Sequence, residues 1–183
     1  MFTDTHCHLY SEYYDDIDEI VKKAQERQIN RVFNNGVDDR TNREILAMLP
    51  KYDCMYAAIG IHPEYVKDYK DDDLKFVEEH LNDDKVFALG EIGLDYHYGK
   101  ENAELQKKLF HKQMVLAEKY HLPVVIHSRD ATEDTIAVLK QYPNVIGDIH
   151  CFSGSIETAK IYISMGYKIA IGGVVTFKNS NLY

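Results

Sequence analysis

The sequence has 183 residues, roughly one domain's length, so we expect a single domain over residues 1–183. Its 30 acidic and 21 basic side chains give a net charge of −9. That charge excludes duplex nucleic-acid binding driven by a basic surface alone, but not a nucleic-acid enzyme whose metal ions supply positive charge. A hydrophobic fraction of 45% and a charged fraction of 28% exclude a disordered chain.

The sequence carries no feature of export or membrane insertion. No apolar run approaches the ~20 residues of a membrane span. The acidic start of the chain lacks the basic region of a signal peptide. The cysteines Cys7, Cys54 and Cys151 are odd in number and widely spaced, which favours free thiols. We therefore expect a cytoplasmic protein without a membrane partner.

Short apolar runs alternate with segments of helical periodicity along the chain. Several runs are uninterrupted, as in Val124–Ile126, which is typical of parallel strands buried on both faces. Between the runs, apolar side chains recur near one helical face, as Leu105, Leu109 and Leu116 do. The strand candidates are Phe2–Thr5, Arg31–Asn35, Met55–Ile61, Val86–Ile92, Pro123–His127, Val145–His150 and Lys168–Val175, and the clearest helix candidates are Leu105–Tyr120, Ala131–Tyr142 and Ser155–Met165.

This alternation predicts an α/β fold with a parallel sheet, in one of two architectures. Length favours an open doubly wound sheet, because a TIM-type (β/α)8 barrel needs at least about 200 residues. No GxGxxG follows the first strand, however, and polar residues follow nearly every strand. Only a barrel gathers those strand ends into one site. We therefore predict a TIM-type barrel with seven strands present and the eighth strand and final helices missing.

The first strand candidate leads into Thr5-His6-Cys7-His8. Residues two apart in a strand point to the same side, so His6 and His8 face one way and Cys7 the other. Two imidazoles beside Asp4 form half of a site for a divalent transition metal. The alternative is a pair of histidines with ordinary hydrogen bonds.

Glu91 lies inside the apolar run Val86–Ile92. A buried carboxylate needs a partner, because an unpaired buried charge is costly. The partner is either a metal ion or a buried Arg or Lys. The flanking Gly90 and Gly93 allow the backbone to approach closely.

Histidines also follow three later strand candidates. His127 ends the most apolar one, where a hydrogen-bonded core histidine is the plainer explanation. His150 shares a side with Asp148 by the period of two, and His62 stands before Pro63, which turns the chain. His or Glu thus occupies five of the seven strand ends, and this repetition favours a metal centre.

Four imidazoles and a carboxylate exceed the three protein ligands of a single catalytic zinc. We therefore expect two divalent metal ions bridged by Glu91. Such a pair activates water and stabilises both oxygens of a displacement at phosphorus. Imidazole ligands suit Zn, Mn, Fe or Ni better than Mg.

Together these motifs resemble the TatD family of metal-dependent deoxyribonucleases. The resemblance rests on Asp4–His8, Gly60–Pro63, Gly90–Tyr96, His127–Ala131, His150–Gly154 and Thr176–Lys178, in the family's order and spacing. It implies an amidohydrolase-type TIM barrel and a cytoplasmic hydrolase whose transient partner is DNA, often cut 3′→5′ on single strands. The family is usually assayed with Mg, which adds that ion to the candidates.

The resemblance also implies roles for single residues. The metal ligands it implies are His6, His8, Glu91, His127 and His150. His62 and Arg129 match positions lining the pocket, where they would contact substrate phosphate. Asp95 would orient neighbouring ligands.

The chain departs from the family at its end. Family members continue through a last helix and an eighth strand whose aspartate binds a metal and helps activate water. Here the sequence stops at Asn179–Tyr183, so we leave the catalytic residue unassigned and expect weak or no activity. Asp148 is a poor substitute, since it lies deeper along its strand. Two unpaired sheet edges predict reduced stability and self-association across the missing strand.

Two alternative functions stay open. One is hydrolysis of a small-molecule ester or amide, or of a charged tRNA, on the same metal scaffold. The other is a metal-binding fragment without catalysis. The net charge of −9 favours the small-molecule hydrolase, whereas Arg129, His62 and Lys178 favour a phosphate-bearing substrate.

Overall fold

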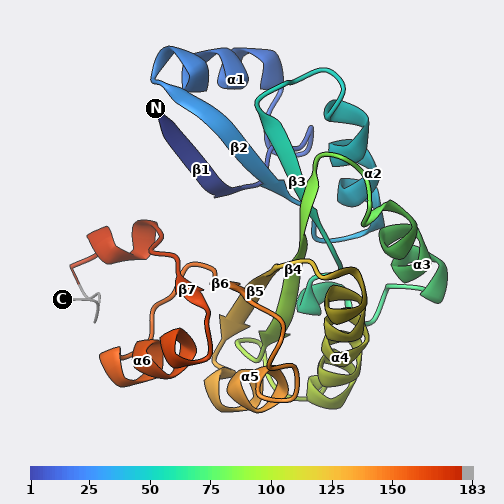
Figure 1. Ribbon diagram of the computed structural model, residues 1–183, viewed down its shortest axis with the longest axis vertical. Helices are drawn as coiled ribbons and strands as arrows, with labels where there is room; N and C mark the ends of the chain where they lie inside the picture. Colours follow the sequence, from blue (N-terminus) through green and yellow to red (C-terminus); the bar gives the residue numbers. More distant parts are fainter. Residues whose placement is uncertain (179–183) are drawn as a thin grey trace.

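A computed structural model describes residues 1–178 of the chain (Figure 1). Strands and helices alternate throughout this part. The strands are β1 (Phe2–Cys7), β2 (Ile29–Asn35), β3 (Met55–Ile59), β4 (Val86–Asp95), β5 (Val124–Arg129), β6 (Gly147–Ile149) and β7 (Lys168–Ile169). The helices are α1 (Ile17–Glu26), α2 (Asp39–Met48), α3 (Asp71–His80), α4 (Ala103–Tyr120), α5 (Thr132–Leu139) and α6 (Ile156–Ser164), with 3₁₀ helices η1 (Pro63–Tyr65) and η2 (Gly173–Thr176).

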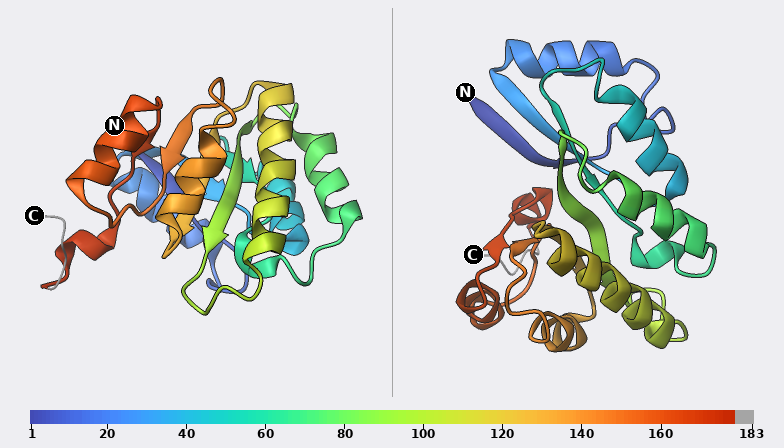
Figure 2. Two further views of the ribbon diagram at one scale, coloured as in Figure 1. Left: turned by 90° about the horizontal axis from the view of Figure 1, so that it is seen from below. Right: turned by 45° about the vertical axis from the view of Figure 1, so that its right-hand side comes forward.

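The strands form one parallel sheet whose spatial order follows the chain from β1 to β7. The sheet curls into an incomplete barrel with the helices on its convex side (Figure 2). The curl brings the ends of β1 and β6 together, where the rings of His6 and His150 stack at 3.7 Å. A doubly wound sheet has helices on both faces. The predicted barrel-type α/β fold with seven strands is therefore confirmed, and the open sheet is wrong.

Two strands end at other residues than the sequence predicts, because pairing with neighbouring strands sets their length. We expected a strand over Lys168–Val175, but β7 ends at Ile169 and residues 173–176 form η2. Gly172 and Gly173 weaken an extended strand, and no described strand pairs with the outer edge of β7. In contrast, β4 runs on to Asp95 because Asp95 pairs with Arg129 of β5. The expected stop before an eighth strand concerns residues 179–183, which lie outside the described residues.

The two faces of the sheet pack differently. The convex face joins the helices in the main core, where Met55, Ile59 and Leu89 are fully buried. Inside the curl, Ala58, Ala88 and Val125 form a separate small cluster. Beside it lies a mainly apolar groove of about 580 Å³. The interior therefore supplies packing, and the chemistry gathers at the carboxyl ends of the strands.

The helices within residues 1–178 are short or polar. Crossing a bilayer takes a long, predominantly apolar helix. None of these helices is both long and apolar enough to do so.

Candidate metal centre

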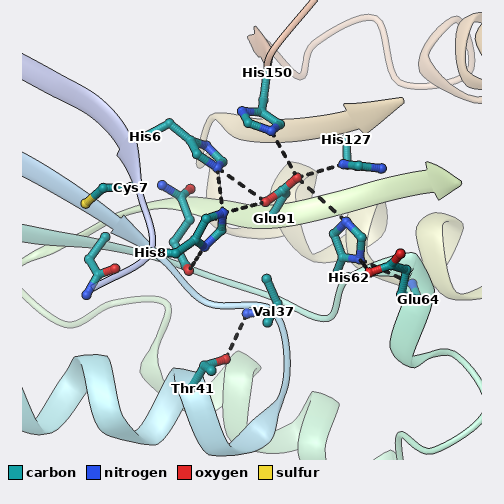
Figure 3. A network of polar contacts seen from close by, with 12 residues as sticks. His6, Cys7, His8, Val37, Thr41, His62, Glu64, Glu91, His127 and His150 are labelled. Atoms are coloured by element: carbon teal, nitrogen blue, oxygen red, sulfur yellow. Dashed lines mark hydrogen bonds and ion pairs between the residues drawn. The ribbon is translucent and has the colours of Figure 1, made fainter. Parts of the chain in front are cut away.

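The strand ends converge on the carboxylate of Glu91 in β4, which is 3% exposed (Figure 3). Its Oε2 atom lies 3.3 Å from His6 Nε2 and 3.4 Å from His8 Nε2. Both histidines come from the end of β1, and their Nε2 atoms are 3.0 Å apart. We call His6 and His8 the Oε2 group.

The other oxygen of Glu91 faces a second set of imidazoles. Oε1 lies 2.8 Å from His127 Nδ1, 3.5 Å from His150 Nε2 and 3.7 Å from His62 Nε2. These histidines come from the ends of β5, β6 and β3 and form the Oε1 group. The structure thus brings all six residues at the five strand ends together, with a separate imidazole group on each oxygen of Glu91.

His8 has a defined orientation in the Oε2 group. Its Nδ1 lies 3.0 Å from the carbonyl oxygen of Asn35, which can only accept a hydrogen bond. Neutral His8 therefore carries its proton on Nδ1 and turns the Nε2 lone pair toward Glu91. A lone pair facing a carboxylate needs a cation between them. Without a metal the cation is a proton, and although burial lowers the pKa of His8, Glu91 raises it more.

His127 is held from both sides in the Oε1 group. Its Nε2 lies 2.8 Å from Asp95 Oδ2, opposite the contact with Glu91. Burial lowers the pKa of His127, but hydrogen bonds with Asp95 and Glu91 outweigh it and raise the pKa to about 9. Asp95 thereby orients the ring with Nδ1 toward Glu91, as a carboxylate does behind a metal-bound histidine.

Gly93 allows β4 to carry both carboxylates to His127. It adopts a φ of +143°, and a Cβ atom there would lie 2.0 Å from the carbonyl oxygen of His127. Only glycine fits this close approach between β4 and β5.

His62 differs from the other members of the Oε1 group. With Glu91 and His127 it offers three ligand atoms within 4.8 Å of one another. However, the backbone N–H of Glu64 donates to His62 Nδ1 at 3.2 Å. Neutral His62 then carries its proton on Nε2, which points toward Glu91. Burial lowers its pKa to about 3, so the ring stays neutral and acts as a hydrogen-bond donor.

Buried amide side chains fix the backbone at these strand ends. Each accepts the N–H and donates to the carbonyl of a single residue, in the way that a neighbouring strand does. The pairs are Asn34 with Leu9, Asn42 with Gly60, Gln113 with Ile61 and Gln106 with Asp95, at 2.8–3.2 Å. Sequence reasoning missed them, although Gln106 and Gln113 lie seven residues apart on the buried face of α4.

A cavity of about 260 Å³ opens above Glu91. Arg129, at the end of β5, lines it together with His62 and Asp95. The guanidinium is exposed and makes no ion pair with a described carboxylate, and it lies 6.0 Å from the ring of Tyr98. Arg129 is therefore free to meet an anion that enters the cavity.

Two further residues near the strand ends, Asp148 and His97, lie outside this cluster. Asp148 lines the apolar groove inside the curl, where burial raises its pKa to about 6. It belongs to neither of the metal-ligand groups found among the described residues. His97 is exposed and pairs with Asp130 at 3.1 Å.

The donor set of the cluster fits divalent metal ions. Burial raises the pKa of Glu91, but hydrogen bonds from His127, His6 and His8 hold it well below its ordinary value, so the carboxylate is charged. A charged carboxylate and imidazole nitrogens at short range are the ligands of zinc and related ions. His6, His8 and Glu91 alone bring three ligand atoms within 4.8 Å of one another.

Comparisons with known proteins agree with this geometry. The family model described as "TatD related DNase" matches residues 3–182. The chain is 42% identical over 183 residues to the Bacillus subtilis protein named "Uncharacterized metal-dependent hydrolase YabD", which covers 98% of this chain and 72% of that protein.

Solved structures show the same fold. The structure of YjjV, a TatD homologue from Escherichia coli, superposes with a TM-score of 0.90 at 31% identity, over 96% of this chain and 70% of that one. A TatD family hydrolase from Entamoeba histolytica gives 0.82 at 25% identity, over 93% and 64%. The chain therefore belongs to the family of TatD-related DNases, whose curated members similar to it are named metal-dependent hydrolases.

Proposed function

We propose that the protein hydrolyses DNA phosphodiester bonds with two divalent metal ions, as a 3′→5′ exonuclease on single strands. One observation carries the proposal: each oxygen of the buried Glu91 faces its own imidazole group. This arrangement supports one ion held by Glu91 with His6 and His8. A second ion would be held by Glu91 with His127 and His150. Membership of the family supports DNA as the substrate.

The side chains around Glu91 divide the work of binding and positioning. Bound divalent ions would lower the pKa of water and neutralise charge on phosphoryl oxygens. The Nε2–H of His62, fixed by the Glu64 N–H, donates to a phosphoryl oxygen. The guanidinium of Arg129 binds the phosphate from the open side of the cavity. The Asp95 carboxylate keeps His127 aligned.

The ligands support a preference among the candidate metals. Imidazole nitrogens dominate both groups, which favours Zn, Mn, Fe or Ni over Mg. We expect mass spectrometry to find two equivalents of such an ion in protein that is produced by cells grown in defined medium. A preparation holding only Mg would contradict this.

The proposal is tested by hydrolysis of end-labelled single-stranded DNA with added Mn or Mg. We expect weak cleavage by the native chain and none by His127→Ala. The matched control is His121→Asn, which removes an exposed imidazole outside the site. Its φ of +55° suits asparagine. Equal cleavage by the native chain and His127→Ala would indicate a contaminating nuclease and sink the proposal.

A second candidate function is hydrolysis of a small ester or amide, or of a charged tRNA. The net charge of −9 favours the small ester or amide, because an acidic protein repels polyanions such as DNA and tRNA. Activity on 4-nitrophenyl acetate without activity on single-stranded DNA would support this candidate. A metal-loaded chain that hydrolyses neither substrate would indicate a binding fragment without catalysis.

We propose that two copies of the 183-residue chain associate through the outer edges of β1 and β7. Neither edge pairs with a described strand, and exposed apolar side chains belong to the segments at these edges, with Phe2 65% and Ile171 55% exposed. Light scattering is expected to show dimers or larger species. A monodisperse monomer with a high melting temperature would contradict this.

We also propose that the protein works in the cytoplasm. The thiols of Cys7, Cys54 and Cys151 are all free, which supports a reducing compartment.

A further inference from the structure

A second cavity adjoins the one above Glu91. It measures about 430 Å³, whereas the cavity at Glu91 measures about 260 Å³. Arg129 lines both cavities, so the two meet at its side chain. The smaller cavity suits a phosphate group, and the larger one falls in the range of small-molecule sites. A substrate held by its phosphate at Glu91 extends its next group past Arg129.

The floor of the second cavity is apolar and ring-lined. Ile149, Phe152 and Tyr162 are buried there, and the rings of Phe152 and Tyr162 meet edge to face at 6.2 Å. Aromatic walls of this kind bind flat rings by stacking and edge contacts.

The charges on the rim of the second cavity determine which part of a nucleotide fits there. Arg129 stands on the side of Glu91, and the carboxylate of Asp130 stands beyond it, paired with His97 at 3.1 Å. A second phosphate beside Asp130 would be repelled. A neutral sugar and base would not be repelled, and their polar edges can bond to Asp130.

We propose that this second cavity is a nucleoside subsite, which takes the sugar and base next to the phosphate held at Glu91. The inference rests on the proposed phosphodiesterase function and adds the recognised part of its substrate. It assigns Phe152 and Tyr162 to contact with the base, and Arg129 to the junction with the phosphate.

The test compares the binding of thymidine 5′-monophosphate and inorganic phosphate by calorimetry. We expect the nucleotide to bind at least about tenfold more tightly than phosphate to the native chain, because only the nucleotide fills both cavities. Ser153→Trp fills the second cavity from its exposed rim and is expected to remove this advantage. Phosphate binding should stay unchanged. The matched control is Ser164→Trp, an exposed serine at the end of α6.

A second variant guards against misfolding of the first. Thr132→Phe fills the cavity from the opposite wall and should act in the same way. Nucleotide binding no tighter than phosphate, or unchanged in both folded variants, would overturn the subsite. A chain that binds the nucleotide in this variant-sensitive manner but cleaves no DNA would retain the subsite and lose the proposed function. Cleavage of DNA with an unchanged KM in both variants would retain the proposed function and overturn the subsite.

Discussion

The two sides of Glu91 are built in different ways. The Oε2 group comes from a single strand end, since His6 and His8 are two residues apart. The Oε1 group draws its imidazoles from the ends of three strands that are far apart in sequence. One side therefore draws its imidazoles from a single strand end, which reaches Glu91 through the curl of the sheet, whereas the other requires that β3, β5 and β6 lie on either side of β4.

The two sides of Glu91 nevertheless orient an imidazole in the same way. On each, a group behind the ring turns an imidazole toward Glu91: the Asn35 carbonyl holds His8, and the Asp95 carboxylate holds His127. The two holders are not equivalent, since a carboxylate carries charge and a carbonyl does not. This difference predicts unequal responses of the two sides to mutation and to pH.

The largest effect is expected from Glu91→Gln, because this change acts on both sides at once. The amide keeps the shape but loses the charge that both ions need. Metal content should fall from two equivalents to near none, and DNA hydrolysis by about 10³-fold or more, as expected when several kcal/mol of charge stabilisation are lost. Mass spectrometry and the end-labelled assay measure the two quantities. Retention of both ions would refute the bridging role.

Single histidine changes should separate the sides. His6→Ala is expected to lose the ion of the Oε2 group and keep the other, and His127→Ala the reverse. Each should reduce hydrolysis by about 100-fold or more. Metal content measured against His121→Asn decides the matter. If either variant loses both ions together, the two sides form one cooperative site and the comparison fails.

A smaller effect is expected from Asp95→Asn. The asparagine retains a hydrogen bond to His127 but not the charge, so the Oε1 group should lose about 10- to 100-fold in metal affinity. The Oε2 group should be unchanged, because Asp95 contacts neither His6 nor His8 in the described hydrogen bonds. Titration with Mn measured by paramagnetic resonance resolves the two affinities. Equal weakening of both would show that Asp95 supports the whole centre.

The same contrast between the two sides explains which features of the site can be predicted from the sequence. The period of two places His6 and His8 together without any knowledge of the fold, and the strand pattern predicts that later strand ends meet them. The tautomer of His62 depends on the turn that presents the Glu64 N–H, which no periodicity shows. The partner of His8 is the carbonyl of Asn35, which follows from the register of β1 against β2 and not from residue type.

Some features cannot be predicted from the sequence, because they depend on contacts between residues far apart in the chain. The amide clamps are an example: Gln113 reaches Ile61 across 52 positions, and its buried place on α4 is the only local clue. Strand length is another, since β7 stops after two residues while β4 extends to Asp95 beside β5. Residue type predicts that a strand exists, and its neighbours decide how long it is.

The smallest effect is expected on the stability of the metal-free protein at alkaline pH. The pKa of His127 is about 9 in the folded chain, above its ordinary 6.5. The stabilisation that His127 provides is therefore complete below pH 6.5 and lost as pH rises through 9. Urea unfolding in EDTA should show a loss of about 1–3 kcal/mol across this window. In His127→Asn the decline should be shallower.

The loss of stability at acid pH has other causes and serves as an internal control. Burial lowers the pKa of His62 to about 3 and of His150 to about 4, so stability falls as pH drops below 6.5. His127→Asn should leave this acid limb in place, and His121→Asn should change neither limb. An alkaline decline that persists in His127→Asn but disappears in His8→Asn would place the proton on the Oε2 side. Glu91 with the neutral Asn35 carbonyl would then hold His8 in the charged form more strongly than Glu91 with Asp95 holds His127, against the contrast drawn between the two sides.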